Sequence, residues 1–109
     1  MPVYNKLVRD FIPQVINSTG KQCRTRILDE EEYKKELNIK LKEESEEYHT
    51  AQNSNESLEE LADMLEVIRA LANVHGASWE ELEEVRKKKA EKRGGFQDRV
   101  YLIDVDNNA

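Results

Sequence analysis

The feature that most constrains this chain is the stretch from Asp29 to Arg93, which contains no proline and a single glycine, Gly76. Proline and glycine are the two residues that most disfavour the interior of a helix. Leu, Ala, Glu, Lys and Arg, which are all good helix formers, fill much of this stretch. Because so few positions can interrupt a helix here, the sequence predicts an all-α fold built from long helices.

Capping residues predict where the helices begin and end. We expect a short helix near 11–18, a long helix that starts at Asp29, a loop at Gln52–Asn55, and further helices at about Ser57–Val74 and Ser78–Arg93. Two segments outside the helices have β-branched or alternating character. These candidate strands of a small two-stranded β-ribbon are Lys21–Leu28 and Arg99–Val105.

Length and charge limit the classes of function. The 109 residues suffice for one modest domain, which we place at residues 1–109. The net charge of −6 argues against a partner that is a nucleic-acid polymer or an anionic membrane. With the single Cys23, no internal disulfide and no long apolar run, we expect a cytoplasmic protein.

The first long helix carries a carboxylate where its core-facing side should be apolar. Spacings of three and four residues define a stripe that comprises Leu37, Leu41, Glu44, Tyr48 and Ala51. Glu44 sits in the middle of this stripe, and a buried carboxylate is costly unless something compensates it. Glu43 flanks Glu44, and Glu47 follows about one turn later.

The second long helix shows the same anomaly. Its apolar residues cover most of its circumference: Leu58, Leu61, Met64, Leu65, Val67, Ile68, Leu71, Ala72 and Val74. At about 100° per residue, Glu60 and Asp63 fall within this apolar territory rather than on the polar strip. A helix so widely apolar is buried on several sides. We therefore expect a helical bundle that is completed by oligomerisation, as a dimer or a tetramer.

Two helices joined by a short loop pack antiparallel, which would bring the two pairs of carboxylates together. Glu44 and Glu47 lie near the end of the first helix, and Glu60 and Asp63 near the start of the second. Unpaired, these groups would repel one another, whereas Mg²⁺, or Mn²⁺ as a substitute, would stabilise them. Two structural alternatives stay open: a solvated acidic face, and a capping box in which Glu60 reaches back to Ser57.

The ordered motifs resemble those of the MazG-like, all-α nucleotide pyrophosphohydrolases. That superfamily is marked by Glu-Glu-x-x-Glu on one helix, here Glu43, Glu44 and Glu47, and by Glu-x-x-Asp on the next, here Glu60 and Asp63. Two flanking segments resemble a small single-domain branch of the superfamily, which includes proteins similar to phosphoribosyl-ATP pyrophosphohydrolase. These segments are 4–10 (YNKLVRD) and 89–96 (KAEKRGGF), so the resemblance covers about residues 3–103.

The resemblance implies an oligomeric MazG-like helical bundle that depends on Mg²⁺. It also implies cleavage of a nucleoside triphosphate, or a related nucleotide, at the α–β phosphate bond to give a monophosphate and pyrophosphate, in a house-cleaning role. Two alternatives remain. One is the phosphoribosyl-ATP pyrophosphohydrolase of histidine biosynthesis, and the other is a non-enzymatic acidic helical regulator or nucleotide sensor. Attack at either the α- or the β-phosphorus is compatible with the motifs.

These arguments predict three sets of functional side chains: metal ligands, a proton acceptor and phosphate ligands. The predicted metal ligands are Glu44, Glu47, Glu60 and Asp63. A carboxylate that the metal does not fully use, Glu43 or Glu47, would accept the proton of the attacking water. The predicted phosphate ligands are Lys89, Arg93, Lys6 and Arg9. The first two of these residues also suit the C-terminal end of a helix for purely electrostatic reasons.

Overall fold

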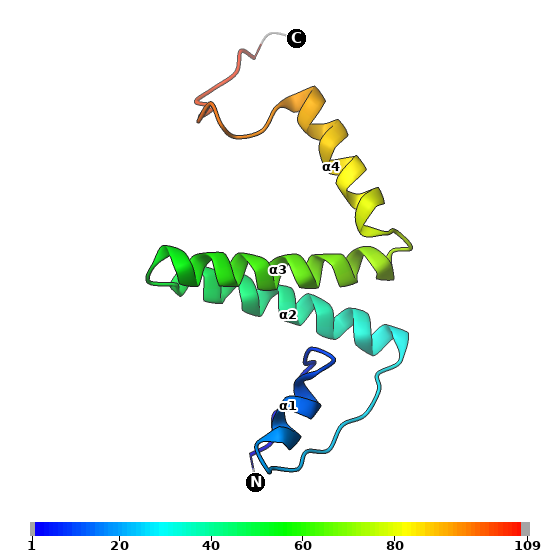
Figure 1. Ribbon diagram of the computed structural model, residues 1–109. Helices are drawn as coiled ribbons and strands as arrows, with labels where there is room; N and C mark the ends of the chain where they lie inside the picture. Colours follow the sequence, from blue (N-terminus) through cyan, green and yellow to red (C-terminus); the bar gives the residue numbers. More distant parts are fainter. Residues whose placement is uncertain (1, 108–109) are drawn as a thin grey trace.

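The computed structural model describes residues 2–107 and contains four helices over that range (Figure 1). They are α1 (Ile12–Ser18), α2 (Glu30–Thr50), α3 (Ser54–Val74) and α4 (Trp79–Arg93). No strand occurs among these residues, so the predicted all-α class is confirmed. None of the helices in the described part is long and apolar enough to cross a membrane.

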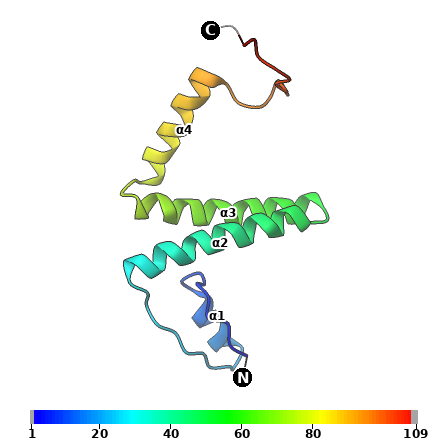
Figure 2. The same ribbon diagram turned by 180° about the vertical axis from the view of Figure 1, so that it is seen from behind.

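The β-ribbon expected from the sequence does not form. Lys21–Leu28 is an irregular connection from α1 to α2, and Arg99–Val105 is irregular chain beyond α4. Figures 1 and 2 show these two segments on opposite sides of the α2–α3 hairpin. Paired strands must lie about 5 Å apart, so the hairpin itself prevents them from meeting.

Side-chain caps define where the two long helices α2 and α3 begin. The Oδ1 atom of Asp29 accepts a hydrogen bond from the backbone N–H of Glu32 at 2.8 Å, so α2 begins where the sequence predicts. Helix α3 begins earlier than predicted, because Asn53 accepts from the backbone N–H of Glu56 at 2.9 Å. Since Asn53 caps α3, Ser57 does not, and Glu60 is not part of a capping box.

The core of the chain is the antiparallel α2–α3 hairpin. Leu37 of α2 and Ala72 of α3 are buried, and so is Glu44. Helix α4 touches α3 near the turn that joins them, where the guanidinium of Arg69 lies over the ring of Trp79 at 5.5 Å from its centroid. The rest of α4 extends away from the hairpin in both views (Figures 1 and 2).

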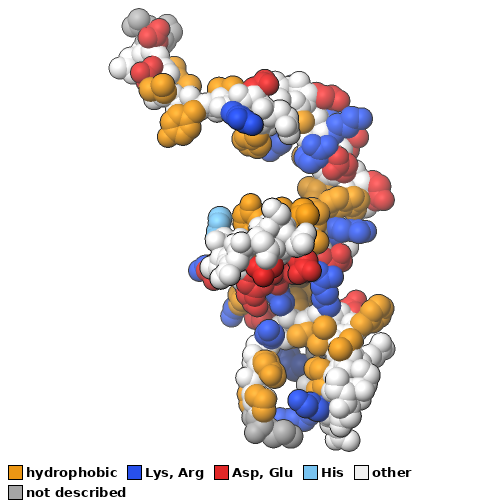
Figure 3. Space-filling model, turned by 60° about the vertical axis from the view of Figure 1, so that its left-hand side comes forward, with side chains coloured by type: hydrophobic (Ala, Val, Ile, Leu, Met, Phe, Trp, Pro, Cys, Tyr) orange, Lys and Arg blue, Asp and Glu red, His pale blue; other side chains and the backbone are white. Residues whose placement is uncertain are grey.

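This arrangement is open for a chain of its length. Its radius of gyration is 18.9 Å, whereas a compact domain of this length would have about 13 Å. Its accessible surface is 10399 Å², against about 6,200 Å² for a compact monomer of this mass. Exposed apolar side chains on the C-terminal segment, which protrudes in Figure 3, contribute to this surface. The chain alone therefore does not close a core.

The turn between α3 and α4 is a helix-ending motif that requires a left-handed residue. Gly76 has φ = 81°, and its N–H donates to the Asn73 carbonyl at 3.0 Å. The N–H of Ala77 donates to the Ala72 carbonyl at 2.9 Å. These two bonds form the Schellman pattern that satisfies the last carbonyls of a helix, so Gly76 sets the direction in which α4 leaves.

We predict that Gly76→Ala lowers the free energy of unfolding by about 1 kcal/mol, because a side chain disfavours positive φ. Thermal unfolding at a fixed protein concentration measures this effect, as a decrease in Tm of about 4–8 °C. Gly95→Ala is the matched control, since Gly95 lacks a positive φ and has no neighbouring atom that a Cβ would meet. Equal losses in the two variants would contradict the assignment.

Candidate metal centre

Five carboxylates gather where α2 and α3 face each other. Helix α2 supplies Glu43, Glu44 and Glu47, and α3 supplies Glu60 and Asp63. Oxygen atoms of Glu43, Glu44 and Glu47 lie within 4.8 Å of one another, and so do oxygen atoms of Glu44, Glu60 and Asp63. Because Glu44 belongs to both groups, it joins the acidic residues of the two helices into one cluster. The convergence predicted from the sequence is present in the fold.

Two oxygens of this cluster are buried without a hydrogen-bond partner: Glu44 Oε2 and Glu60 Oε2. The Glu44 residue is only 8% exposed. A buried acceptor without a hydrogen-bond donor costs free energy, and the cost is larger for a carboxylate than for a neutral group. Clustered carboxylate oxygens are the ligands that a hard divalent cation prefers. The site therefore fits such a cation, and α2 and α3 position its ligands.

The electrostatics of the cluster have the same physical origin. Burial, followed by the proximity of Glu47 and Glu60, raises the pKa of Glu44 to about 7. Burial and the nearby Glu47 also raise the pKa of Glu60 above its usual range. Without a cation, Glu44 therefore tends to hold its proton near neutral pH. Binding of a divalent cation would release that proton, which couples metal affinity to pH.

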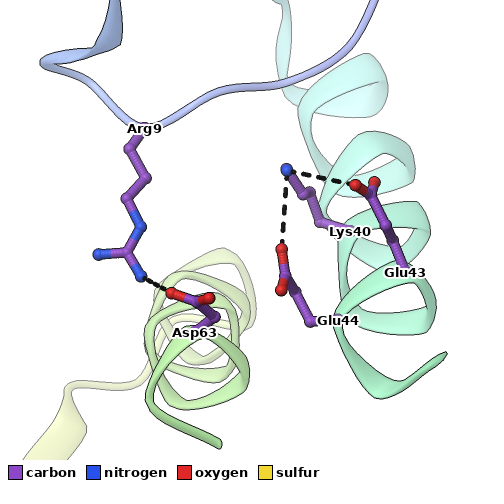
Figure 4. Close-up of polar contacts among 5 residues, drawn as sticks. All are labelled: Arg9, Lys40, Glu43, Glu44 and Asp63. Carbon is purple, nitrogen blue, oxygen red and sulfur yellow. Dashed lines mark hydrogen bonds and ion pairs between the residues drawn. The ribbon is translucent and has the colours of Figure 1, made fainter. Parts of the chain in front are cut away.

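Two basic side chains contact the cluster (Figure 4). The Nη2 atom of Arg9 donates to Asp63 Oδ1 at 2.6 Å. Lys40 Nζ lies 3.8 Å from Glu44 Oε1 and 3.9 Å from Glu43 Oε1. Lys40 was missed in the sequence analysis, although its position three and four residues before two of the predicted site residues is a recognisable pairing signal on a helix.

The four predicted phosphate ligands lie in different places. Arg9 reaches the carboxylates directly, and Lys6 lies on the same N-terminal segment, with its Nζ 5.9 Å from the centroid of the Tyr4 ring. Lys89 and Arg93 are exposed on the distal half of α4, which leads away from the hairpin (Figure 1). Within one chain, the fold does not bring these last two residues to the carboxylates. Their role as phosphate ligands stays a prediction.

The hairpin and its carboxylates define a class of all-α proteins in which acidic side chains from adjacent helices are placed to hold a divalent cation. A family described as phosphoribosyl-ATP pyrophosphohydrolase matches residues 8–90, so the chain belongs to that family. The family is divalent-metal dependent and is part of the MazG-like all-α superfamily, which confirms the resemblance noted from the motifs. The protein is thus a nucleotide pyrophosphohydrolase, a hydrolase that acts on phosphoric anhydrides.

The extent of the match bears on the flanking segments. It contains Arg9 and all five carboxylates, but it starts after Lys6 and ends at Ala90, before Arg93. No curated protein and no solved structure gave a significant match to the chain. The single domain at residues 1–109 and the individual site residues therefore stay predictions that rest on the geometry above.

We predict that Glu44→Gln stabilises the metal-free protein in a pH-dependent way. A pKa raised from 4.5 to about 7 means that the native state binds more protons than the unfolded state across this window. The free energy of unfolding of the unaltered protein must then fall as the pH rises from about 4.5 to 7. Glutamine cannot ionise, so the stability of the variant relative to the unaltered protein should rise over the same window, by up to about 3 kcal/mol.

Denaturant unfolding in a chelator at pH 5 and pH 8 measures this difference. Glu46→Gln is the control, because Glu46 is exposed on the same helix and its substitution should change stability little at either pH. A Glu44→Gln variant whose relative stability is the same at both pH values would contradict a buried, proton-retaining carboxylate.

Proposed function

We propose that this protein hydrolyses a nucleoside triphosphate, or a related nucleotide, at the α–β phosphate bond to give a monophosphate and pyrophosphate, with Mg²⁺ as cofactor. The observation that carries the proposal concerns Glu44 and Glu60. Each has one buried oxygen without a partner, and the two residues form a possible ligand set with Asp63. Membership of a pyrophosphohydrolase family supports the reaction class. A house-cleaning role, in which unwanted nucleotides are removed, is the biological function that we propose.

The proposed ligands of Mg²⁺ are Glu44, Glu60 and Asp63, with Glu47 at the exposed edge of the cluster. When bound, Mg²⁺ would neutralise phosphate charge and would lower the pKa of a water molecule that it binds. Glu47 or Glu43 would accept the proton of the attacking water. Of these two, Glu43 also lies beside Lys40, whereas Glu47 is free of any ion pair among residues 2–107 and open to solvent.

Basic side chains would bind the phosphates that leave. Arg9 is already at the cluster, and Lys6 precedes it on the same segment. We propose that Lys89 and Arg93 also contribute, because a leaving pyrophosphate develops more charge than one guanidinium can offset. We further propose a cytoplasmic site of action, with which a free and exposed Cys23 is compatible.

The second candidate substrate is phosphoribosyl-ATP, the intermediate of histidine biosynthesis, and the description of the matching family favours it. Both candidates contain the same α–β phosphoric anhydride, so the carboxylate cluster serves either. The substrates differ in the group attached to the base, and a direct comparison of turnover distinguishes them.

We predict that the protein with Mg²⁺ releases pyrophosphate from at least one member of a panel of NTPs, dNTPs and phosphoribosyl-ATP. For the best substrate, Glu44→Gln, Glu60→Gln and Asp63→Asn should each lower kcat/KM by about 100-fold or more, since even residues outside the ligand shell cost 10- to 100-fold. The measurement is enzyme-coupled detection of pyrophosphate.

Glu46→Gln is the control for these variants, because its side chain lies on the exposed side of α2 and it should keep nearly full activity. A wild-type protein that releases no pyrophosphate from any nucleotide of the panel would refute the proposed function. Activity confined to phosphoribosyl-ATP would select the second candidate.

We also propose that the chain associates with copies of itself, as a dimer or a tetramer. Leu58, Leu61 and Leu65 are 64%, 41% and 49% exposed and recur at helical spacing on one face of α3. The chain exposes about 4,000 Å² more surface than a compact monomer of its mass, and a stable interface typically needs about 1,600 Å². The exposed surface is thus more than large enough for a partner copy.

Multi-angle light scattering should give at least a dimer at micromolar concentration. Leu65→Glu should shift the protein toward the monomer, because it places a charge within the apolar face of α3. Ile27→Glu is the control: Ile27 is 94% exposed in the connection before α2, outside that face. A monomeric wild-type protein, or dissociation by the control alone, would contradict the proposed interface.

A further inference from the structure

The segment before α1 is attached to the α2–α3 hairpin through the carboxylate cluster itself. Arg9 Nη2 lies 2.6 Å from Asp63 Oδ1, and the two side chains are 58% and 39% exposed. Among the hydrogen bonds and ion pairs of residues 2–107, this is the link between residues 2–11 and the hairpin. Figure 4 shows Arg9 descending from that segment onto Asp63 of α3.

The same carboxylate is in the ligand set that the proposed function assigns to Mg²⁺. A guanidinium next to this carboxylate repels an incoming divalent cation. It also forms an ion pair with one of the two oxygens of Asp63. The pair is partly exposed, so solvent moderates the repulsion without abolishing it. Arg9 in its present position therefore lowers the affinity of the cluster for a bare cation.

A polyphosphate reverses the effect of Arg9 on the affinity for the cation. The planar guanidinium binds phosphate oxygens through paired hydrogen bonds more strongly than it binds one exposed carboxylate oxygen. Since the phosphates of a metal–nucleotide complex must lie next to the metal ligands, they lie within the region that the Arg9 side chain already occupies. A bound nucleotide thus offers Arg9 a better partner and frees Asp63 for the cation.

We propose that Arg9 exchanges partners, from Asp63 in the metal-free protein to a substrate phosphate in the loaded protein, and so makes the cation and the nucleotide bind cooperatively. The inference rests on the proposed function. By thermodynamic linkage, the factor by which a bound cation raises the affinity for the nucleotide equals the factor by which a bound nucleotide raises the affinity for the cation. The cluster then binds its cation weakly until a polyphosphate is present.

The test is the affinity of the full chain for Mn²⁺ alone, measured by electron paramagnetic resonance of the free ion. Arg9→Gln should bind Mn²⁺ about two- to fivefold more tightly than the wild type, because an opposing charge is lost. The same variant should raise KM for the best nucleotide of the panel by about tenfold or more, because a charged hydrogen bond to phosphate is lost. Arg9→Lys, which keeps the charge, should bind Mn²⁺ like the wild type.

Arg26→Gln is the matched control. Arg26 pairs with Glu32 at 2.8 Å, with exposures of 68% and 42%, and neither residue belongs to the cluster. It should leave both the Mn²⁺ affinity and KM unchanged. Equal or weaker Mn²⁺ binding by Arg9→Gln would overturn the exchange and make Arg9 a supporting residue of Asp63. A wild type that binds no Mn²⁺ at all would overturn the proposed metal site and this inference together.

Discussion

The burial of Glu44 between α2 and α3 is the constraint on which the rest of the structure depends. Its side chain stands in an otherwise apolar stripe, and one of its oxygens has no hydrogen-bond partner in the described residues. The hairpin could pack more favourably with a leucine at this position, because burying a carboxylate is costly. The fold is therefore less stable at its centre than an apolar core would be. Because the family is divalent-metal dependent, we propose that cation binding is the physical reason.

Helix geometry explains why the sequence revealed so much of this site. Residues three apart on one helix share a face. Once the two helices were recognised, this spacing predicted that Glu44 and Glu47 point to the same side of α2. It predicted the same for Glu60 and Asp63 on α3. The antiparallel packing then followed from a short loop. The cap on α3 was placed too late because Asn53 and Ser57 both precede glutamates at capping distance, and local sequence does not decide between them.

The same reasoning could not predict contacts between segments that are far apart in the sequence. The Arg9–Asp63 pair joins residues 54 positions apart, and no periodicity in the sequence encodes it. The β-ribbon was wrong for a related reason. Lys21–Leu28 and Arg99–Val105 have local character that suits strands, but pairing depends on the path of the chain between them, and the hairpin intervenes. Lys40, by contrast, was within reach of helix geometry, because it precedes Glu43 and Glu44 by three and four residues on the same helix.

Charge balance links the openness of the chain to its chemistry. Five carboxylates meet Arg9 and Lys40 at the cluster, so acidic groups outnumber basic ones even after one divalent cation is added. A triphosphate brings further negative charge to the same place, and additional cations must hold it. Lys89 and Arg93 take part in no ion pair among residues 2–107 and lie on a helix that leads away from its own cluster. We therefore propose that these two side chains serve the cluster of a neighbouring copy, which would give the proposed self-association a catalytic reason as well as an apolar one.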